Sequence, residues 1–199
     1  MRRLTTDLFV SLDGYAKGEH AGPYFDMYGP ELGRWIDEHL AEPQVLLMGR
    51  VTYEALSPMS RSGEAGAQPS RMDELPKIVL SRTLREPLAW PNTRVAAGDL
   101  AALVENLKHG DGDPLRTIGS VSLVRDLVGL GLVDRLRLVV FPIVLGPDGR
   151  EPLFAGFPST QLELVASSVL DGRLLLLEYR PSFDRPPSAA GRREWRSAV

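Results

Sequence analysis

The stretch VLLMGRVTYE, residues 45–54, runs from a short apolar strand through Gly49 straight into a helix. The stretch LRTIGSVSLV, residues 115–124, repeats this order around Gly119. A helix N-terminus presents unpaired backbone N–H groups and about half a positive charge, and glycine lets a ligand oxygen approach the backbone. We therefore expect the two junctions to hold one anion between them. The pyrophosphate of a dinucleotide is the leading candidate.

The composition predicts a single soluble domain. The chain has 199 residues, of which 43% are hydrophobic, enough to bury one substantial core. Its formal net charge of −3 and its scattered arginines provide no basic field, which disfavours nucleic-acid binding. The chain contains no cysteine, which excludes disulfides, zinc–thiolate sites and thiol nucleophiles. We expect one domain over residues 1–181 and a flexible, proline- and arginine-rich tail over residues 182–199.

Neither a signal peptide nor a membrane span is expected. Asp7 interrupts the apolar stretch of residues 4–12, and no small-residue cleavage site follows it. The longest apolar run, residues 138–145, is far shorter than the roughly 18 to 20 residues that span a bilayer. We therefore expect a cytoplasmic protein.

Short apolar runs alternate with helical patterns and predict an α/β sheet. Strands are expected at residues 4–10, 45–48, 77–81, 93–96, 115–119 and 135–144, and helices at residues 30–40, 99–108 and 120–130. Two later strands, residues 162–169 and 174–179, are joined through Leu170-Asp171-Gly172-Arg173 and predict a closing antiparallel hairpin. Clustered glycine, proline and serine predict a long loop over residues 57–69.

Polar side chains at the first junction are suited to hold a phosphate. Gly49 permits a tight turn, Arg50 supplies a cation, and Thr52 supplies a hydroxyl close to the backbone N–H groups. The competing interpretation is an ordinary strand-to-helix turn with a solvated arginine.

Two further strand ends carry similar groups. Gly119, Ser120 and Ser122 offer close backbone approach and hydroxyl donors, although serine is also an ordinary helix N-cap. Ser81 and Arg82 end another strand and are suited to grip the ribose phosphate that distinguishes NADPH from NADH. Because ligands of open α/β sheets bind beyond the carboxyl ends of the strands, three such ends favour a shared site over chance.

Other chemistries find no support in the sequence. His20, His39 and His109 lack the spacing of a zinc site, so we expect no metal. There is no G-x-S-x-G motif and no serine, histidine and aspartate arrangement for acyl transfer.

The motifs, taken in order, resemble the dihydrofolate reductase-like fold. They resemble most closely the family related to the reductase domain of the bacterial riboflavin-biosynthesis bifunctional deaminase-reductase. The marks are SLDGY at residues 11–15, MGRVTYE at 48–54, IVLS at 78–81, IGS at 118–120, GLVDRL at 131–136 and FPIVLG at 141–146. The resemblance covers residues 1–181 and implies a mainly parallel sheet of roughly eight strands with an antiparallel last strand and flanking helices.

This resemblance implies NADPH-dependent hydride transfer to a C=N or C=O bond of a small heterocycle, such as a pteridine or pyrimidine. The matching cofactor positions are Gly49, Arg50 and Thr52 in a phosphate turn, Ser81 and Arg82 at the adenosine phosphate, Gly119, Ser120, Val121 and Ser122 in the pyrophosphate turn, and Leu12, Asp13 and Gly14 in the loop over the nicotinamide. The expected substrate pocket involves Tyr15, Trp35, Phe141 and Pro142.

The catalytic proton donor stays open. The position that is acidic in dihydrofolate reductases is Gly33 here, and Glu31 is shifted by two positions, roughly 200° around a helix. Asp13, Glu31 and water are the candidates. A protein that binds a nucleotide or heterocycle without turnover is the alternative, and a flavin-dependent oxidoreductase is a third hypothesis.

We also expect a homodimer. The family resemblance motivates it, together with the apolar residues 136–144 and 174–177, which are suited to continue a core across a two-fold axis.

Overall fold

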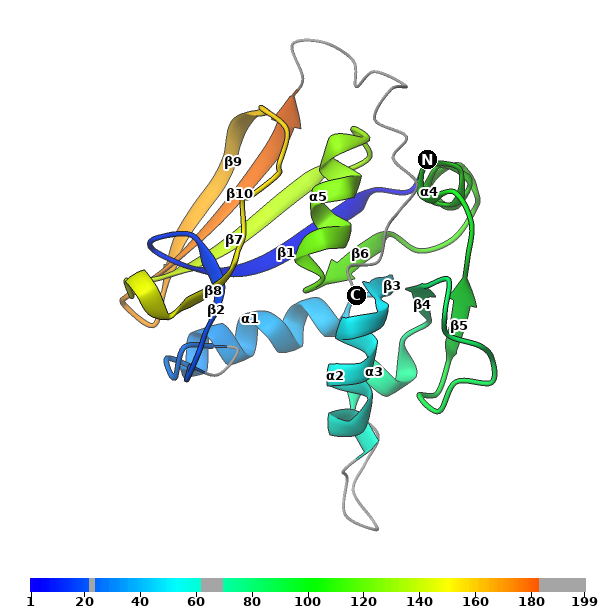
Figure 1. The fold of residues 1–199 in the computed structure, drawn as a ribbon, viewed down its shortest axis with the longest axis horizontal. Helices are drawn as coiled ribbons and strands as arrows, with labels where there is room; N and C mark the ends of the chain where they lie inside the picture. Colours follow the sequence, from blue (N-terminus) through cyan, green and yellow to red (C-terminus); the bar gives the residue numbers. More distant parts are fainter. Residues whose placement is uncertain (22–23, 62–69, 183–199) are drawn as a thin grey trace.

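The computed structural model describes residues 1–21, 24–61 and 70–182. An eight-stranded sheet has the strand order β5-β4-β3-β6-β1-β7-β10-β9 (Figure 1). Its strands are β1 (Leu4–Ser11), β3 (Val45–Gly49), β4 (Lys77–Leu80), β5 (Thr93–Ala96), β6 (Leu115–Ile118), β7 (Arg135–Phe141), β9 (Gln161–Leu170) and β10 (Leu174–Ser182). The pairs from β5 to β7 are parallel, whereas β10 is antiparallel to both β7 and β9. The expected mainly parallel sheet with an antiparallel last strand is confirmed.

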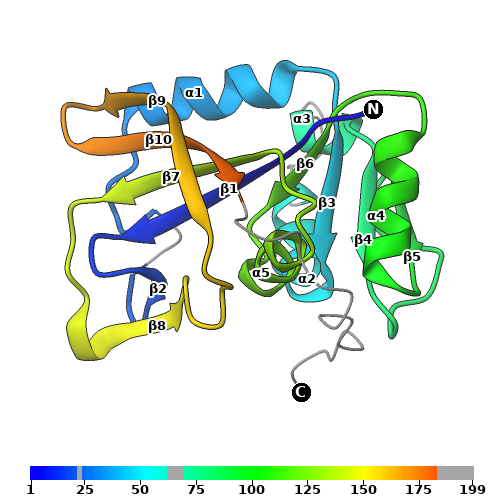
Figure 2. The ribbon, with the colours of Figure 1, turned by 90° about the horizontal axis from the view of Figure 1, so that it is seen from above.

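Helices cover both faces of the sheet (Figures 1 and 2). They are α1 (Pro30–Ala41), α2 (Arg50–Arg61), α3 (Arg71–Glu74), α4 (Leu100–His109) and α5 (Val121–Gly129), with a 3-10 turn η1 (Gly146–Asp148). The largest core joins α4 and α5 to one face, whereas two smaller cores place α1, α2 and α3 against the other. In α5, the apolar residues Val121, Val124 and Val128 follow helical spacing and are buried, which is why this segment docks as a helix.

The N-terminus of α1 is capped from the far end of the chain. Asp171, in the turn between β9 and β10, accepts hydrogen bonds from the backbone N–H groups of Glu31 (2.9 Å) and Leu32 (3.1 Å). A Cβ atom at Gly29 would lie only 2.3 Å from the Asp171 carboxyl carbon. Only glycine leaves room for this cap, which ties α1 to the hairpin.

One prediction about local structure is wrong, and one small sheet was not predicted. The loop expected over residues 57–69 begins later, because α2 continues through Arg61 despite Pro58, and residues 62–69 lie outside the described part of the chain. A second, two-stranded sheet of β2 (Tyr15–Gly18) and β8 (Gly149–Pro152) was not predicted. Both strands are short, and exposed charged residues, glycine and proline interrupt any apolar alternation.

The strand ends also differ from expectation. β7 ends at Phe141 rather than at residue 144, and β10 reaches Ser182, past the expected domain boundary at residue 181. The expected tail therefore falls almost wholly on residues 183–199, outside the described part. Among the helices that the structure does describe, none combines the length and apolarity needed to cross a bilayer.

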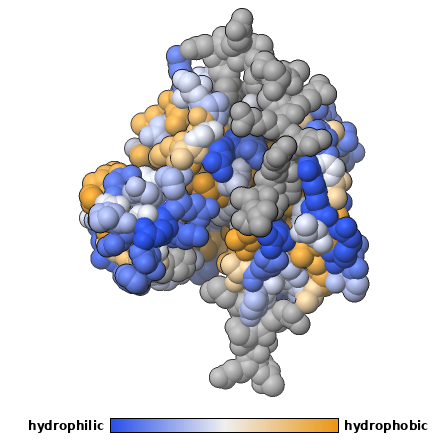
Figure 3. Space-filling view, viewed as in Figure 1, coloured by the Kyte–Doolittle hydropathy of each residue, from blue (hydrophilic) through white to orange (hydrophobic). Residues whose placement is uncertain are grey.

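The outer hairpin carries an apolar surface, here called the β9 apolar face and made of Leu162, Leu164, Val169 and Leu175. The strand register places all four on the sheet face of Tyr179, and their exposed fractions run from 38% to 56%. Hydrophobic atoms gather over β9 and β10 at the upper left of Figure 3. By contrast, the β7 residues that we expected at a dimer interface are mainly buried in this chain's own core, Phe141 completely. A two-fold contact built from these apolar strands would therefore use the outer hairpin rather than β7.

Candidate functional site

A cleft of about 2280 Å³ opens where β3 and β6 run into α2 and α5. Its walls come from β1, β2, β8, α1 and the first turns of α2, α4 and α5. Pockets for one drug-sized ligand usually measure about 300–1,000 Å³. The cleft therefore has room for a dinucleotide and a small second ligand, at the strand ends where open α/β sheets bind ligands.

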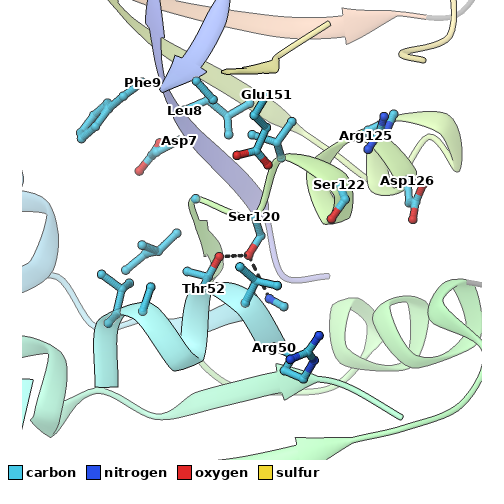
Figure 4. Close-up of a pocket in the computed structure, with 18 of the residues that line it drawn as sticks. Asp7, Leu8, Phe9, Arg50, Thr52, Ser120, Ser122, Arg125, Asp126 and Glu151 are labelled. Carbon is cyan, nitrogen blue, oxygen red and sulfur yellow. Dashed lines mark hydrogen bonds between the residues drawn. The ribbon is translucent and has the colours of Figure 1, made fainter. Parts of the chain in front are cut away.

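The two glycine junctions lie side by side in this cleft, because β3 and β6 are adjacent parallel strands. The Ser120 hydroxyl accepts a hydrogen bond from the Gly49 N–H (2.9 Å) and lies 2.6 Å from the Thr52 hydroxyl (Figure 4). Gly119 and Ser120 both have a positive φ, +53° and +61°. Glycine adopts this conformation freely, whereas Ser120 is held in it by its two contacts.

Ser120 precedes α5 but makes no side-chain cap hydrogen bond to it. The N-termini of α3 and α4 are capped by Ser70 and Asp99. Within the described part of the chain, the first turns of α2 and α5 hold no acidic residue, and Val121 and Ser122 line the cleft. The N-terminus of α5 thus offers backbone donors and positive potential to an anion. The Gly49 N–H, which we expected to serve the ligand, is bound to Ser120 instead.

The two arginines that we expected to bind phosphate, Arg50 and Arg82, both line the cleft, but they differ in their ion pairing. Arg50 donates two hydrogen bonds to Glu54, at 3.0 and 2.8 Å, so its charge is largely balanced. Arg82 is exposed and has no ion-pair partner among the described residues. Ser81 is 98% buried and does not line the cleft, because its hydroxyl accepts from the N–H groups of Thr83 and Leu84 and closes its own turn.

The loop expected over the nicotinamide lies outside the cleft lining. Leu12 is 63% exposed, and Gly14 pairs through its backbone with Leu153. The Asp13 carboxylate accepts hydrogen bonds from the Gly146 and Leu145 N–H groups and from the Ser11 hydroxyl. These bonds, that from Gly146 foremost, lower the pKa of Asp13. Asp13 therefore fixes the loop and stays ionised.

Of the expected substrate residues, only Trp35 lines the cleft. Phe141 is buried against Phe9 and Phe25, and Pro142 is exposed beyond the end of β7. Tyr15 packs over Gly149 in the β2–β8 ribbon, and Glu31 accepts a hydrogen bond from the Asp171 N–H at the start of α1. Each of these side chains is engaged elsewhere.

Sequence reasoning missed a charged cluster in the floor of the cleft. The Asp7 carboxylate of β1 accepts hydrogen bonds from Nε of Arg116 on β6 and, at 2.7 Å, from Nε of Arg137 on β7. The Trp35 ring of α1 covers both guanidinium groups, 5.7 and 5.4 Å from its centroid. All four side chains are nine-tenths buried or nearly so. We call this set the Arg116 cluster.

The signal for the cluster is present in the sequence. Asp7, Arg116 and Arg137 each interrupt an apolar strand that the sheet buries on both faces, where charges occur only when paired. Glu151 of β8 gave no such signal. It has a positive φ of +57°, forms an ion pair with Lys17 (3.3 Å), and projects into the cleft above Ser120 (Figure 4).

Known proteins are similar to this chain in sequence and in fold. Residues 2–176 match the model of the RibD C-terminal domain. The chain is 30% identical over 161 residues to the uncharacterized protein YyaP of Bacillus subtilis (strain 168), covering 77% of this chain and 80% of that protein.

Solved structures superpose over nearly the whole chain. A riboflavin biosynthesis protein of Shewanella sp. PV-4 gives a TM-score of 0.67 at 23% identity, over 92% of this chain and 100% of that one. Dihydrofolate reductase of Enterococcus faecalis, solved with NADP(H), gives 0.60 at 15% identity, over 91% of this chain and 97% of that one.

A bifunctional enzyme shares the fold over part of its length. The diaminohydroxyphosphoribosylaminopyrimidine deaminase/5-amino-6-(5-phosphoribosylamino)uracil reductase of Thermotoga maritima gives a TM-score of 0.64 at 16% identity, over 91% of this chain and 57% of that one. At these identities the structures establish the dihydrofolate reductase-like fold. The match over residues 2–176, together with the relative at 30% identity, establishes that the chain belongs to the RibD C-terminal domain family.

Proposed function

We propose that this protein is an NADPH-dependent reductase of a C=N or C=O bond in a small pteridine- or pyrimidine-like heterocycle. The observation that carries the proposal is the pair of converging turns, in which Ser120 bonds to Gly49 and Thr52 and leaves the N-terminus of α5 uncapped in the cleft. Family membership supports it, because the solved relatives with this fold include reductases of a pyrimidine and of dihydrofolate.

The residues present fit a dinucleotide phosphate. In this proposal the N–H groups of Val121 and Ser122 bind the pyrophosphate, and Arg82, exposed at the rim, binds the 2′-phosphate with Arg50 as its neighbour. Bound NADPH supplies the hydride. The apolar side chains of Leu8, Ile36 and Leu40, which line the cleft on the Trp35 side, exclude water from the second ligand.

Of the proton donors that the sequence suggested, Asp13, Glu31 and water, only water remains. Asp13 and Glu31 do not line the cleft, and both carboxylates are bound to backbone N–H groups. Gly33 has no side chain, so the position that is acidic in dihydrofolate reductases holds no carboxylate here.

Titration with NADPH and NADH by calorimetry tests the cofactor assignment. A charge-assisted contact contributes about 1.5 to 3 kcal/mol, so Arg82→Ala should weaken NADPH binding roughly ten- to a hundredfold and NADH binding little. The Arg50→Ala, Arg82→Ala double variant should lose the preference. Arg85→Ala is the matched control, because Arg85 lies close in sequence but does not line the cleft, and its guanidinium donates to the backbone carbonyls of Arg82 and Leu84. An unchanged preference in the double variant would remove both arginines from the phosphate site.

The alternative is a protein that binds a nucleotide or heterocycle without turnover, and the missing carboxylate at Gly33 favours it. NADPH oxidation across a panel of pterins, pyrimidinones and quinone-like acceptors separates the two functions. Oxidation with any acceptor supports the reductase, whereas binding without oxidation in every case supports the alternative. A yellow colour on purification would instead indicate a flavin.

A further inference from the structure

We propose that Arg116 recognises a planar oxyanion on the substrate, so that the second ligand in the cleft is an anionic heterocycle. This inference rests on the proposed function for the identity of the reaction, but it concerns a separate part of the cleft. The planar oxyanion is either a carboxylate substituent or an ionised amide edge of the ring, since both present two acceptor atoms in one plane.

The Arg116 cluster carries an unbalanced positive charge. Two guanidinium groups, those of Arg116 and Arg137, share the single carboxylate of Asp7. Glu42 also acts on Arg116 through space, but it stands exposed at the end of α1 and forms no ion pair with it. Water and salt screen such an exposed charge.

The hydrogen-bonding capacity of the cluster is also incomplete. Arg116 uses Nε for Asp7, and its two terminal nitrogens have no hydrogen-bond partner within the described part of the chain. Its side chain is only 9% exposed, but its terminal nitrogens are not among the buried atoms that lack a partner, so they still reach the solvent of the cleft. Burial accordingly lowers the pKa of Arg116, which the Asp7 carboxylate opposes. Buried guanidinium groups are costly unless they are paired and bonded, and a carboxylate ligand would supply both.

The cluster is positioned for a ligand rather than for the core alone. Asp7, Arg116 and Trp35 line the cleft, whereas Arg137 lies behind them. Arg116 is on the same face of β6 as Ile118, which also lines the cleft immediately before the Gly119 turn. A ligand at Arg116 would thus sit beside a cofactor at that turn, within about three residues of strand, or roughly 10 Å.

The residues of the Arg116 cluster have separate roles. Asp7 orients the Arg116 guanidinium through Nε and leaves its terminal nitrogens toward the cleft, so Asp7 is a positioning residue. Trp35 covers one face of the guanidinium pair by cation–π contact and shields it from water. Arg116 alone is left to bind the anion in bidentate fashion.

Paired ligands that differ by one charge test the inference. Orotate and its neutral carboxamide share a ring and differ in the carboxylate. 5-Nitrouracil has lost a ring amide proton at neutral pH, whereas uracil keeps it. We expect the wild type to bind at least one anion more tightly than its neutral twin in calorimetric titrations without cofactor. Which pair shows the preference distinguishes a carboxylate substituent from an ionised ring.

Arg116→Gln should abolish this preference, with a loss of about ten- to a hundredfold for the anion and little change for the neutral twin. Arg125→Gln is the matched control, because Arg125 lines the cleft on α5 but bonds to the Ala155 carbonyl, away from Asp7 (Figure 4). Arg116→Lys keeps the charge but not the bidentate geometry and should weaken anion binding at least severalfold. Thermal unfolding establishes whether each variant folds. If Arg116→Gln does not fold, the anion preference of Arg116→Lys tests the inference.

Two results would overturn the inference: a wild type without preference for either anion, or folded Arg116 variants with the wild-type preference. NADPH titrations of the same samples keep this test separate from the proposed function. If NADPH binds but no anion is preferred, the anion site at Arg116 is wrong and the proposed reductase stands. If an anion is preferred but NADPH does not bind, the proposed reductase is wrong and the anion site stands.

Discussion

The hydroxyl oxygens of Thr52 and Ser120 lie 2.6 Å apart although 68 residues separate them in the chain. The contact joins the first turn of α2 to the turn before α5, and the Gly49 N–H completes the link. One serine therefore sets the spacing of two helix N-termini, and the first prediction concerns its removal.

Ser120→Ala should destabilise the protein by about 1–2 kcal/mol, because it leaves the Gly49 N–H without its acceptor and keeps a side chain at positive φ. Ser120→Gly should cost less, because glycine relieves the backbone strain while losing the same hydroxyl. Urea unfolding of the three proteins gives the difference. Equal stability of the alanine variant and the wild type would show that the link contributes nothing.

Asp7→Asn should be far more damaging, by about 3–5 kcal/mol, because it leaves two buried guanidinium groups without a counter-charge. Adding Arg137→Met should recover part of the loss. Glu163→Gln serves as the control, since the Glu163–Arg180 pair is exposed and such pairs contribute about 0–1 kcal/mol. Unfolding by urea measures all four proteins, and a cost for Asp7→Asn as small as the control would contradict the assigned role.

Lys77 predicts a dependence of stability on pH. It is 99% buried at the start of β4, and burial lowers its pKa from 10.5 to about 8. Between these two values the unfolded chain binds more protons than the folded one, so Lys77 makes the free energy of unfolding rise with pH, by at most about 1.4 kcal/mol per unit.

Lys77→Met should remove this slope. It also removes hydrogen bonds to the carbonyls of Met72 (2.5 Å) and Leu75 (2.6 Å), so it should be less stable overall. The informative quantity is the difference between the two unfolding free energies, measured from pH 7.5 to 10.5. A constant difference across that range would exclude the shifted lysine.

The β9 apolar face predicts a homodimer. Leu164→Glu should convert it to a monomer, because the charge would be buried at the contact. Ser168→Glu places the same charge on the opposite face of the same strand and should leave the dimer intact. Light scattering at low micromolar concentration measures the mass, and a monomeric wild type would end the hypothesis.

The sequence predicted what is encoded locally. The junctions at Gly49 and Gly119 are strand, glycine and helix in direct succession, and the Asp171-Gly172 turn announces its hairpin, so these features are readable without tertiary contacts. The Arg116 cluster is different, because its charges come from three strands that become neighbours only in the finished sheet. A charged residue in an apolar strand indicates that it has a partner in the fold, but it does not indicate which residue that partner is.

The expected site residues that are engaged elsewhere have both kinds of partner. The Asp13 carboxylate binds the backbone N–H groups of Leu145 and Gly146, which only the fold brings close, whereas the Ser81 hydroxyl closes its own turn through the N–H groups of Thr83 and Leu84. Phe141 is apolar enough for a pocket wall, yet the aromatic rings around it bury it completely.

The cap that Asp171 places on α1 has a consequence for synthesis on the ribosome. Its acceptor oxygens lie 140 and 139 residues beyond the amides they bind, in the turn of the last hairpin. α1, which carries Trp35, therefore leaves the ribosome without the cap on its first turn. The cap can form only after nearly the whole chain has been translated. A protein truncated before this turn would lack the cap on α1, the helix that carries Trp35.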